Sequence, residues 1–205
     1  MDNNTSRIRG RPKHDTSREP VQDVLLRTAA RLFMEKGYEQ VSLDHIARAC
    51  NVSKPSIYYH FANKPELFKA SVIALLNMVN TKTAHLLDEA GDLESGLLNV
   101  AETRLANPHP EFEMIMKEAA NYLSPDQLEL IRAAEQQIYH LLASRFKLAM
   151  EQGEFRTNDP MLLAQTFSTM LLLGNRHDTR QQFASPSDLG KQIVDLFLHG
   201  ASFAN

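Results

Sequence analysis

Residues 42–61 restrict the fold more tightly than any other part of the sequence. Ser42 precedes apolar residues at helical spacing, and its hydroxyl can accept a hydrogen bond from the free backbone N–H groups of a short helix. Asn51 follows at once, and asparagine tolerates the left-handed backbone of a sharp turn. Ser53 can cap a further helix over about 54–61, with Pro55 in its first turn, where a missing N–H costs nothing. Two short helices joined by so tight a turn predict a helix-turn-helix, whose second helix is shaped to enter the major groove of DNA.

The second helix of this motif has a surface suited to DNA. Apolar side chains hold the two helices together in this interpretation: Ile46, Ala47, Val52, Ile57 and Phe61. The side chains left to face outward are Lys54, Pro55, Ser56, Tyr58, Tyr59 and His60. Hydroxyls, an ammonium and an imidazole can bond phosphates or base edges, whereas proline and aromatic rings can touch thymine methyls. Two adjacent tyrosines usually indicate core packing, but neighbours on a helix point about 100° apart, and Ile57 and Phe61 already occupy the core face.

The flanking segments also read as helices. Residues 19–36 carry apolar residues at helical spacing, and Gly37 stands where a helix C-terminal cap belongs. Lys64 and Pro65 open a long helix that reaches about Glu89. Because this helix begins beside the expected recognition helix, Lys64 is well placed for a phosphate.

Charge is unevenly distributed along the chain. Residues 1–64 hold 11 Lys and Arg against 7 Asp and Glu, residues 65–205 hold 11 against 18, and the net charge is −3. A basic N-terminal part joined to an acidic body is typical of a nucleic-acid-binding module attached to a domain with another role. An excess this small can also arise by chance.

The motif and its flanks resemble the N-terminal pattern of the TetR family of bacterial transcriptional regulators over residues 20–70. The matching positions are Ala29 to Phe33, Gly37-Tyr38, Ser42, Ile46-Ala47, the run from Val52 to Phe61, Lys64 and Leu67. One departure is Asn51, where the family usually has glycine. The resemblance implies an all-α subunit of about nine helices, with three for DNA and the rest for ligand sensing and dimerisation. It also implies a dimer that reads a palindromic operator.

The family pattern further implies which residues touch DNA. The positions that carry over are Ser42, Lys54, Pro55, Ser56, Tyr58, Tyr59, His60 and Lys64. Tyr58 and Lys64 are expected to position phosphates, whereas Lys54, Pro55 and Tyr59 are the better candidates for base readout. We therefore expect a flexible arm over 1–18, a DNA-binding domain over 19–64 and a helical body over 65–205.

The expected arm contains Arg9-Gly10-Arg11-Pro12, which matches the core of an AT-hook. Arg9 and Arg11 suit the narrow, strongly negative minor groove of A·T-rich DNA, and Gly10 permits close approach. The alternative is a basic arm with only nonspecific attraction to phosphate.

The body contains two apolar segments that favour self-association. Between Met161 and Gly174 the sequence is apolar nearly all round the helix, so that helix must be covered on two sides. The final helix offers a second apolar surface, and two helices from each of two subunits would make a four-helix interface. The residues expected there are Leu163, Phe167, Met170, Leu171, Gly174, Leu189, Ile193, Leu196, Phe197 and Gly200. The alternative is a core within one chain.

Residues for an effector pocket are only weakly indicated. Methionines could give an adaptable apolar lining, and a few polar groups could fix a ligand's orientation. The candidates are Met78, Met114, Met116, Met170, Arg104, Tyr139, His140 and Thr169. Methionine at helical spacing is more often core, and Tyr139 and His140 could face solvent.

Several other classes are disfavoured. The eight histidines show no paired metal-binding spacing, no phosphate loop or nucleophile elbow is present, and one cysteine cannot begin a metal cluster. We expect neither an enzyme, nor a cofactor or metal site, nor a membrane or secretory segment, and therefore a cytoplasmic location. The expected function is a homodimeric repressor released from its operator by a small apolar or amphipathic effector. The alternative is a DNA-bound regulator controlled by a partner protein, or an activator.

Overall fold

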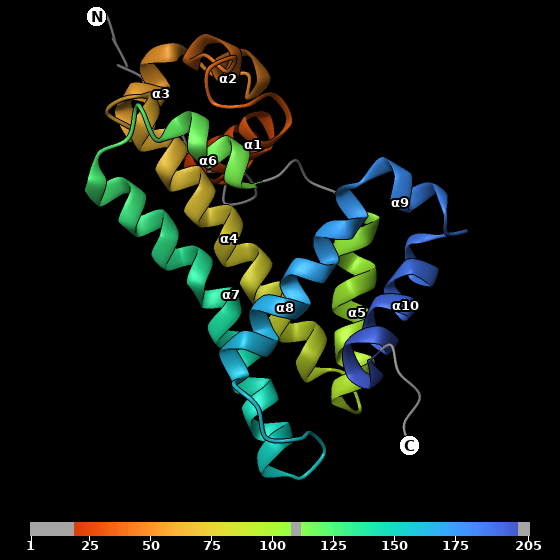
Figure 1. Cartoon of the computed structure of the whole chain (residues 1–205). Helices are drawn as coiled ribbons and strands as arrows, with labels where there is room; N and C mark the ends of the chain where they lie inside the picture. The colour runs from red at the N-terminus through yellow and green to blue at the C-terminus, as the bar shows by residue number, and fades with distance from the viewer. Residues whose placement is uncertain (1–18, 108–111, 201–205) are drawn as a thin grey trace, which may run out of the picture.

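The computed structural model describes residues 19–107 and 112–200, and within them every regular element is a helix (Figure 1). The N-terminal helices are α1 (Val21–Lys36), α2 (Leu43–Ala49), α3 (Lys54–His60) and α4 (Lys64–Asp88). The body continues with α5 (Leu93–Ala106), α6 (Phe112–Ala119), α7 (Pro125–Glu151), α8 (Pro160–Leu171), the 3-10 helix η1 (Leu172–Asn175), α9 (His177–Gln181) and α10 (Pro186–His199). The predicted all-α class is confirmed, with ten α-helices in the described residues where about nine were expected.

Short polar side chains fix where most helices begin. Seven N-cap residues each accept a hydrogen bond from the backbone N–H three residues later: Ser42, Ser53, Asn63, Asp92, Ser124, Asp159 and Ser185. Helices α3, α4, α7, α8 and α10 also carry proline in the first turn, where the missing N–H would have no partner within the helix. These local signals explain why the predicted helix boundaries lie close to the observed ones.

Two hydrophobic cores lie at opposite ends of the molecule. The first joins α1, α2 and α3 to the first half of α4, to α6 and to the start of α7, around Phe33, Phe68 and Ile131. The second joins the end of α4 to α5, α8, α10 and the second half of α7, around Phe146 and Phe167. Helices α4 and α7 pack on each other and run through both ends (Figure 1). The N-terminal helices therefore share their core with the body.

None of the described helices is long and apolar enough to cross a membrane. Arg9, Gly10, Arg11 and the rest of the expected arm lie outside the described residues.

Candidate nucleic-acid interface and effector groove

A buried apolar contact sets the geometry of the helix-turn-helix. Ile46 on α2 and Ile57 on α3 are fully buried, and Ala47 and Phe61 are nearly so. Asn51 has a φ of 53°, the left-handed conformation that the sequence predicts for the turn. The next residue, Val52, donates its backbone N–H to the carbonyl of Ala47 at 3.0 Å. The two helices are thus held as one unit, and one face of α3 is left for solvent.

That free face carries the residues that the sequence places on it. Tyr59 is 85% exposed and Tyr58 is 50% exposed. Lys54, Pro55 and the N-cap Ser42 of α2 are also exposed, whereas Ser56 and His60 are half-buried. The Tyr59 and His60 rings meet edge to face, with centroids 5.0 Å apart. Aromatic, hydroxyl and cationic groups therefore lie together on the outer face of α3.

Asp44 is a member of this surface that the sequence reasoning missed. Its Oδ2 lies 2.8 Å from the Nζ of Lys54, which joins the start of α2 to the start of α3. The hydrogen bond and charge of Asp44 raise the pKa of Lys54. The signal was a carboxylate in the first turn of α2, but only the folded turn shows that it meets Lys54. This exposed ion pair turns the lysine towards the start of α2 in the DNA-free protein.

Lys64 is more enclosed than the sequence suggests. Its Nζ lies 4.2 Å from the centroid of the Tyr38 ring and 3.4 Å from the backbone carbonyl of Glu39. Burial lowers the pKa of Lys64, although Glu118 and Glu39 oppose that shift. Lys64 therefore combines a structural contact with the expected phosphate contact.

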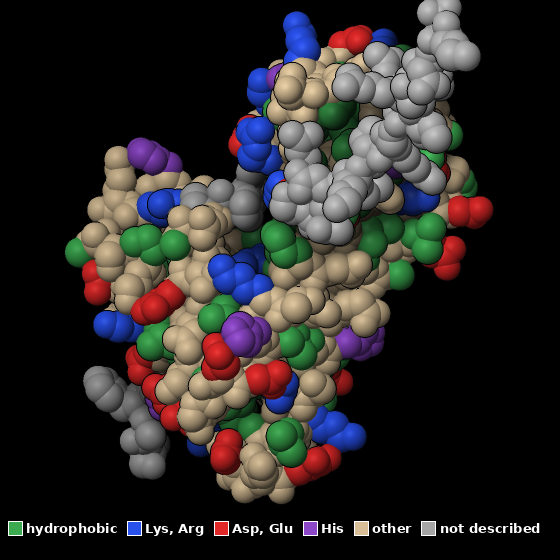
Figure 2. All heavy atoms as spheres, turned by 180° about the vertical axis from the view of Figure 1, so that it is seen from behind, with side chains coloured by type: hydrophobic (Ala, Val, Ile, Leu, Met, Phe, Trp, Pro, Cys, Tyr) green, Lys and Arg blue, Asp and Glu red, His purple; other side chains and the backbone are tan. Residues whose placement is uncertain are grey.

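The positive charge of the N-terminal part is concentrated in the arm. Residues 19–64 hold 6 Lys and Arg against 5 Asp and Glu, so the helix-turn-helix region itself is nearly neutral. In Figure 2, Asp and Glu side chains are frequent over the lower part of the visible face. Lys and Arg side chains occur on both the upper and the lower part. A DNA contact at this surface would therefore depend on individual cations such as Lys54 and Lys64.

The end of α6 and the turn after it are tied to the turn that follows α1. The backbone N–H of Glu39 donates to Oε1 of Glu118 at 2.6 Å, and the Tyr122 hydroxyl donates to Oε1 of Glu39 at 2.7 Å. Tyr122 also stacks on Tyr38, with centroids 5.0 Å apart. Gly37 permits this approach, since a Cβ there would lie 2.6 Å from Oε2 of Glu118 and its φ is 82°. We call the set Glu39, Glu118 and Tyr122 the α6 junction.

A polar groove of about 460 Å³ opens between α6, α7 and α8. Its lining is Glu113, Arg132, Glu135, Gln136, Tyr139, Gln165 and Thr169. Arg132 donates to both carboxylate oxygens of Glu113, at 2.8 and 3.0 Å, and to Glu135 at 2.7 Å. Hydrogen bonding to Arg132 lowers the pKa of Glu113. Arg132 on α7 therefore bridges Glu113 on α6 and Glu135 on α7 within the lining of the groove.

Only some of the residues proposed for an effector pocket lie together. Tyr139 and Thr169 line the groove, and Arg104 lies close enough to Tyr139 for their charges to interact, with burial lowering the pKa of Arg104. His140 is exposed and does not line the groove. The methionines are dispersed: Met78 and Met114 are exposed, Met116 is buried in the first core, and Met170 is half-buried against the second. The structure does not gather them into one lining.

The expected dimer residues divide into an inner and an outer set. Phe167, Leu171, Gly174, Leu189 and Ile193 are buried within the single subunit. Leu163, Met170 and Phe197 are half-buried against the second core, whereas Leu196 and Gly200 are exposed. The outer apolar side chains of α8 and η1 are Leu162, Leu172 and Leu173, which are 56%, 48% and 40% exposed. Which side of this nearly all-apolar helix faces inward depends on α5 and α7, so the sequence alone could not assign it.

A helix-turn-helix with an outward polar and aromatic face, carried on a helical body, defines the class of DNA-binding regulators. Residues 25–71 match the family model of bacterial regulatory proteins, tetR family. This match places the N-terminal part of the chain in the TetR family of transcriptional regulators.

The relatives in sequence share mainly this region. IcaR of Staphylococcus epidermidis, a negative transcriptional regulator of the biofilm operon icaADBC, is 42% identical over 52 residues, which are 25% of this chain and 28% of IcaR. IcaR of Staphylococcus aureus strain Newman is 38% identical over 60 residues, 29% of this chain and 32% of that protein. The chain thus spans about a third of the length of these relatives.

The likeness to solved structures extends further along the chain. The TetR-family regulator PfmR of Thermus thermophilus aligns over 87% of this chain and 99% of its own, with 25% identity and a TM-score of 0.65. The body therefore has the helical arrangement of such a regulator.

Proposed function

We propose that this protein is a homodimeric repressor that occupies a palindromic operator and is released by a small-molecule effector. The observation that carries the proposal is the outer face of α3, where Tyr58, Tyr59 and Lys54 are exposed on a helix anchored by buried Ile57. Exposed aromatic side chains on a short helix have little use in a solvated surface, but they can contact sugars, phosphates and thymine methyls. The similarity of residues 25–71 to regulators such as IcaR supports repression.

In this proposal the DNA contacts follow the exposure of each side chain. Tyr58, Lys64 and the N-cap Ser42 position phosphates, and Lys54, Pro55 and Tyr59 approach base edges, with Ser56 and His60 beside them. To reach a base, Lys54 must leave Asp44, because its ammonium pairs with that carboxylate in the free protein. Arg9, Gly10 and Arg11 of the arm would add a minor-groove contact.

The dimer would be formed through the outer face of α8. Leu162 on α8 and Leu172 and Leu173 on η1 are exposed, and α8 packs beside α10, which exposes Leu196. A second copy with the same face would cover these leucines in an isologous interface of four helices. Two recognition helices at fixed separation are what a palindrome requires.

The effector would act through the groove and α6. Glu113 belongs to α6, and Arg132 and Tyr139 belong to α7, so a ligand that replaces the Glu113–Arg132 ion pair would displace α6. The α6 junction would carry that displacement to the turn before α2, and α4, shared by both cores, would shift with it. This shift would change the distance between the two recognition helices of the dimer. Operator affinity would fall because the helices would no longer match successive major grooves. By linkage, DNA would disfavour the effector to the same extent.

The first experiment is selection of bound fragments from random DNA with the purified full chain at stated salt. We expect a palindromic motif with half-sites about one helical turn apart. Lys54→Ala and Tyr59→Ala should bind that motif more weakly while the oligomeric state is unchanged. Recovery of no motif from a folded protein would contradict sequence-specific binding by the protein alone.

One observation favours the second candidate function, a DNA-bound regulator controlled by a partner protein. The groove is open and polar and carries two carboxylates, Glu113 and Glu135, against one cation, Arg132, a lining better suited to a polar peptide segment with a basic group than to an apolar molecule. If the protein binds its operator and no small molecule from a broad set changes the affinity, partner control becomes the better explanation.

A further inference from the structure

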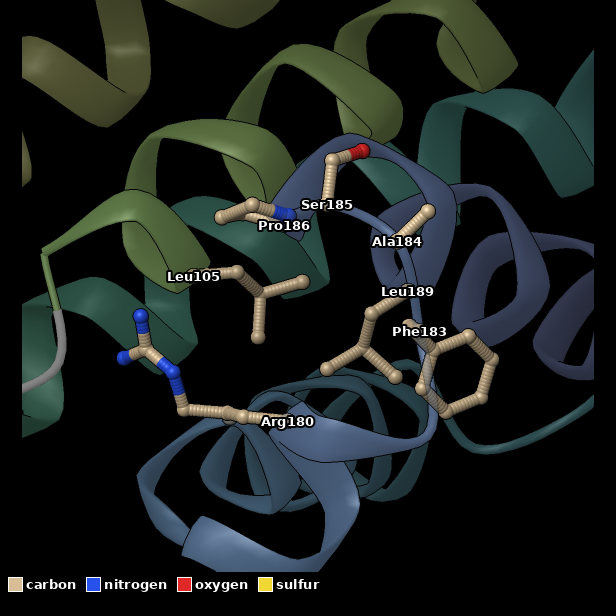
Figure 3. A pocket seen from close by; sticks show the side chains of 8 residues that line it. Leu105, Arg180, Phe183, Ala184, Ser185, Pro186 and Leu189 are labelled. Atoms are coloured by element: carbon tan, nitrogen blue, oxygen red, sulfur yellow. The ribbon is translucent and has the colours of Figure 1, made fainter.

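A second, more apolar cavity of about 220 Å³ lies where α5, η1, α9 and α10 meet. Its lining is Leu105, Gly174, Arg180, Phe183, Ala184, Ser185, Pro186 and Leu189. Figure 3 shows Leu105 and Leu189 pointing into the hollow from two sides, with Arg180 on the α9 side. This cavity shares no lining residue with the groove between α6, α7 and α8.

The shape of the cavity is built into the fold. Leu105 and Leu189 are 2% and 4% exposed and belong to the second core, so the inner wall is fixed by packing. Gly174 lets Leu105 lie where it does, because a Cβ at this position would collide with Cδ2 of Leu105. The wall is thus apolar and preformed.

Arg180 gives the cavity its single cation. Among the described residues it has no ion pair and no side-chain hydrogen bond, whereas Arg176, one helical turn earlier, binds Asp178 at 2.8 Å. Nearby carboxylates of Asp188 and Glu102 accept hydrogen bonds from Ser185 and Ser187, and neither carboxylate lines the cavity. The lining therefore combines an apolar body with one cation that no described carboxylate pairs with.

We propose that this cavity binds a small amphipathic monoanion, an apolar ring or branched chain that bears one carboxylate. The apolar part would lie between Leu105, Leu189 and Phe183, and the carboxylate would meet the guanidinium of Arg180. A cavity of roughly 150 Å³ holds benzene, so about 220 Å³ admits a ring with one carboxylate.

The test uses the full chain without DNA, so that its failure would leave the proposed repression untouched. Sodium benzoate is titrated into protein with ¹³C-labelled leucine methyls, and benzamide serves as the neutral probe of similar shape. We expect the Leu105 and Leu189 methyl signals, assigned by leucine-to-isoleucine replacement, to shift saturably with benzoate. Benzamide should bind about two- to fivefold more weakly, the loss expected for one exposed charge contact.

A pair of arginine variants locates the charge. Arg180→Gln should reduce benzoate affinity about two- to fivefold and leave benzamide affinity unchanged. Arg176→Gln is the matched control, since that residue is an exposed arginine of the same segment and does not line the cavity. Leu105→Phe should block both probes by filling the hollow, in a protein whose circular dichroism shows that it remains folded.

Three results of the benzoate and benzamide titrations would overturn the proposal. They are the absence of saturable leucine shifts, equal affinity for benzoate and benzamide, and benzoate binding that Arg180→Gln does not weaken. If the same methyl signals shift with protein concentration instead, a second copy of the chain occupies the cavity and the ligand assignment is wrong.

Discussion

Tyr59 allows the DNA contribution of one side chain to be separated from its contribution to folding. Its ring is 85% exposed, so Tyr59→Ala should change the free energy of unfolding by no more than about 0.5 kcal/mol. Operator affinity should fall by about 1–3 kcal/mol if the ring contacts DNA. Fluorescence anisotropy with the selected operator gives the affinity, and urea unfolding gives the stability. An unchanged affinity would remove Tyr59 from the interface.

Ionisation of Tyr38 should make the free energy of unfolding depend on pH above about pH 10. Burial, helped by the charge of Tyr122, raises the pKa of Tyr38 from 10 to about 12. The folded state therefore holds this proton more tightly, so the associated stability is fully present below pH 10 and is lost as the pH rises towards 12. Near pH 11.5 the loss should be about 2 kcal/mol.

Tyr38→Phe isolates this effect from other titrations. Phenylalanine keeps the packing against Phe33 and Phe68 but cannot ionise. The free energy of unfolding, measured in urea at pH 9 and pH 11.5, should fall more for the natural chain than for the variant. Equal falls would show that the phenol is not protected.

The sequence predicted the conformation of single residues correctly wherever the signal was local. Ser42, Asn51, Ser53 and Pro55 act within a few residues of themselves, and the structure places each as a cap, a left-handed turn or a first-turn proline. The Asp44–Lys54 ion pair was missed because it spans ten residues across the turn, where many partners were open to the lysine.

The α6 helix is the element whose role depends most on long-range contacts. Glu118 and Tyr122 meet Glu39 across 79 and 83 residues of sequence, a pairing that no periodicity indicates. Glu118→Ala should lower the free energy of unfolding by about 1 kcal/mol, because the Glu39 N–H loses its acceptor. Amide exchange at residues 38–41 should also become faster. Urea unfolding and hydrogen exchange test these two effects.

Lys117→Ala provides the control on the same helix. Lys117 is exposed and makes no ion pair with any described residue, so its removal should leave both measurements unchanged. If the two variants behave alike, the α6 junction does not hold the turn after α1.

Helix α8 shows why the body was harder to predict than the DNA-binding end. Its sequence is apolar on most sides. The spacing therefore identifies a helix that must be buried on two sides, but it does not show which side packs within the subunit and which side is left for a partner. The structure turns Phe167 and Leu171 towards the second core and leaves Leu162, Leu172 and Leu173 outside. Helices α5 and α7 make that choice, and their faces were not assignable from the sequence. The expected effector residues were uncertain for the same reason.

The exposed apolar face formed by Leu162, Leu172 and Leu173 connects self-association of the whole molecule with operator binding. Burying three exposed leucines against a second copy is favourable in proportion to the apolar area removed from water, and a charge placed among them would oppose it. Leu173→Glu should therefore convert a dimer into a monomer at micromolar concentration, as measured by sedimentation velocity. The subunit should keep its helical circular dichroism, since this side chain is already 40% exposed.

DNA binding by the Leu173→Glu variant tests whether this face, and not another apolar surface, forms the dimer. The monomeric variant should retain weak binding to a half-site but lose the added affinity that a full palindrome gives through two linked contacts. Leu130→Glu is the matched control, because Leu130 is 52% exposed on α7 and belongs to no proposed interface. That variant should remain dimeric and bind the palindrome as the natural chain does. If Leu173→Glu also stays dimeric, the two copies meet through another surface, and the separation of their recognition helices must be derived from that one.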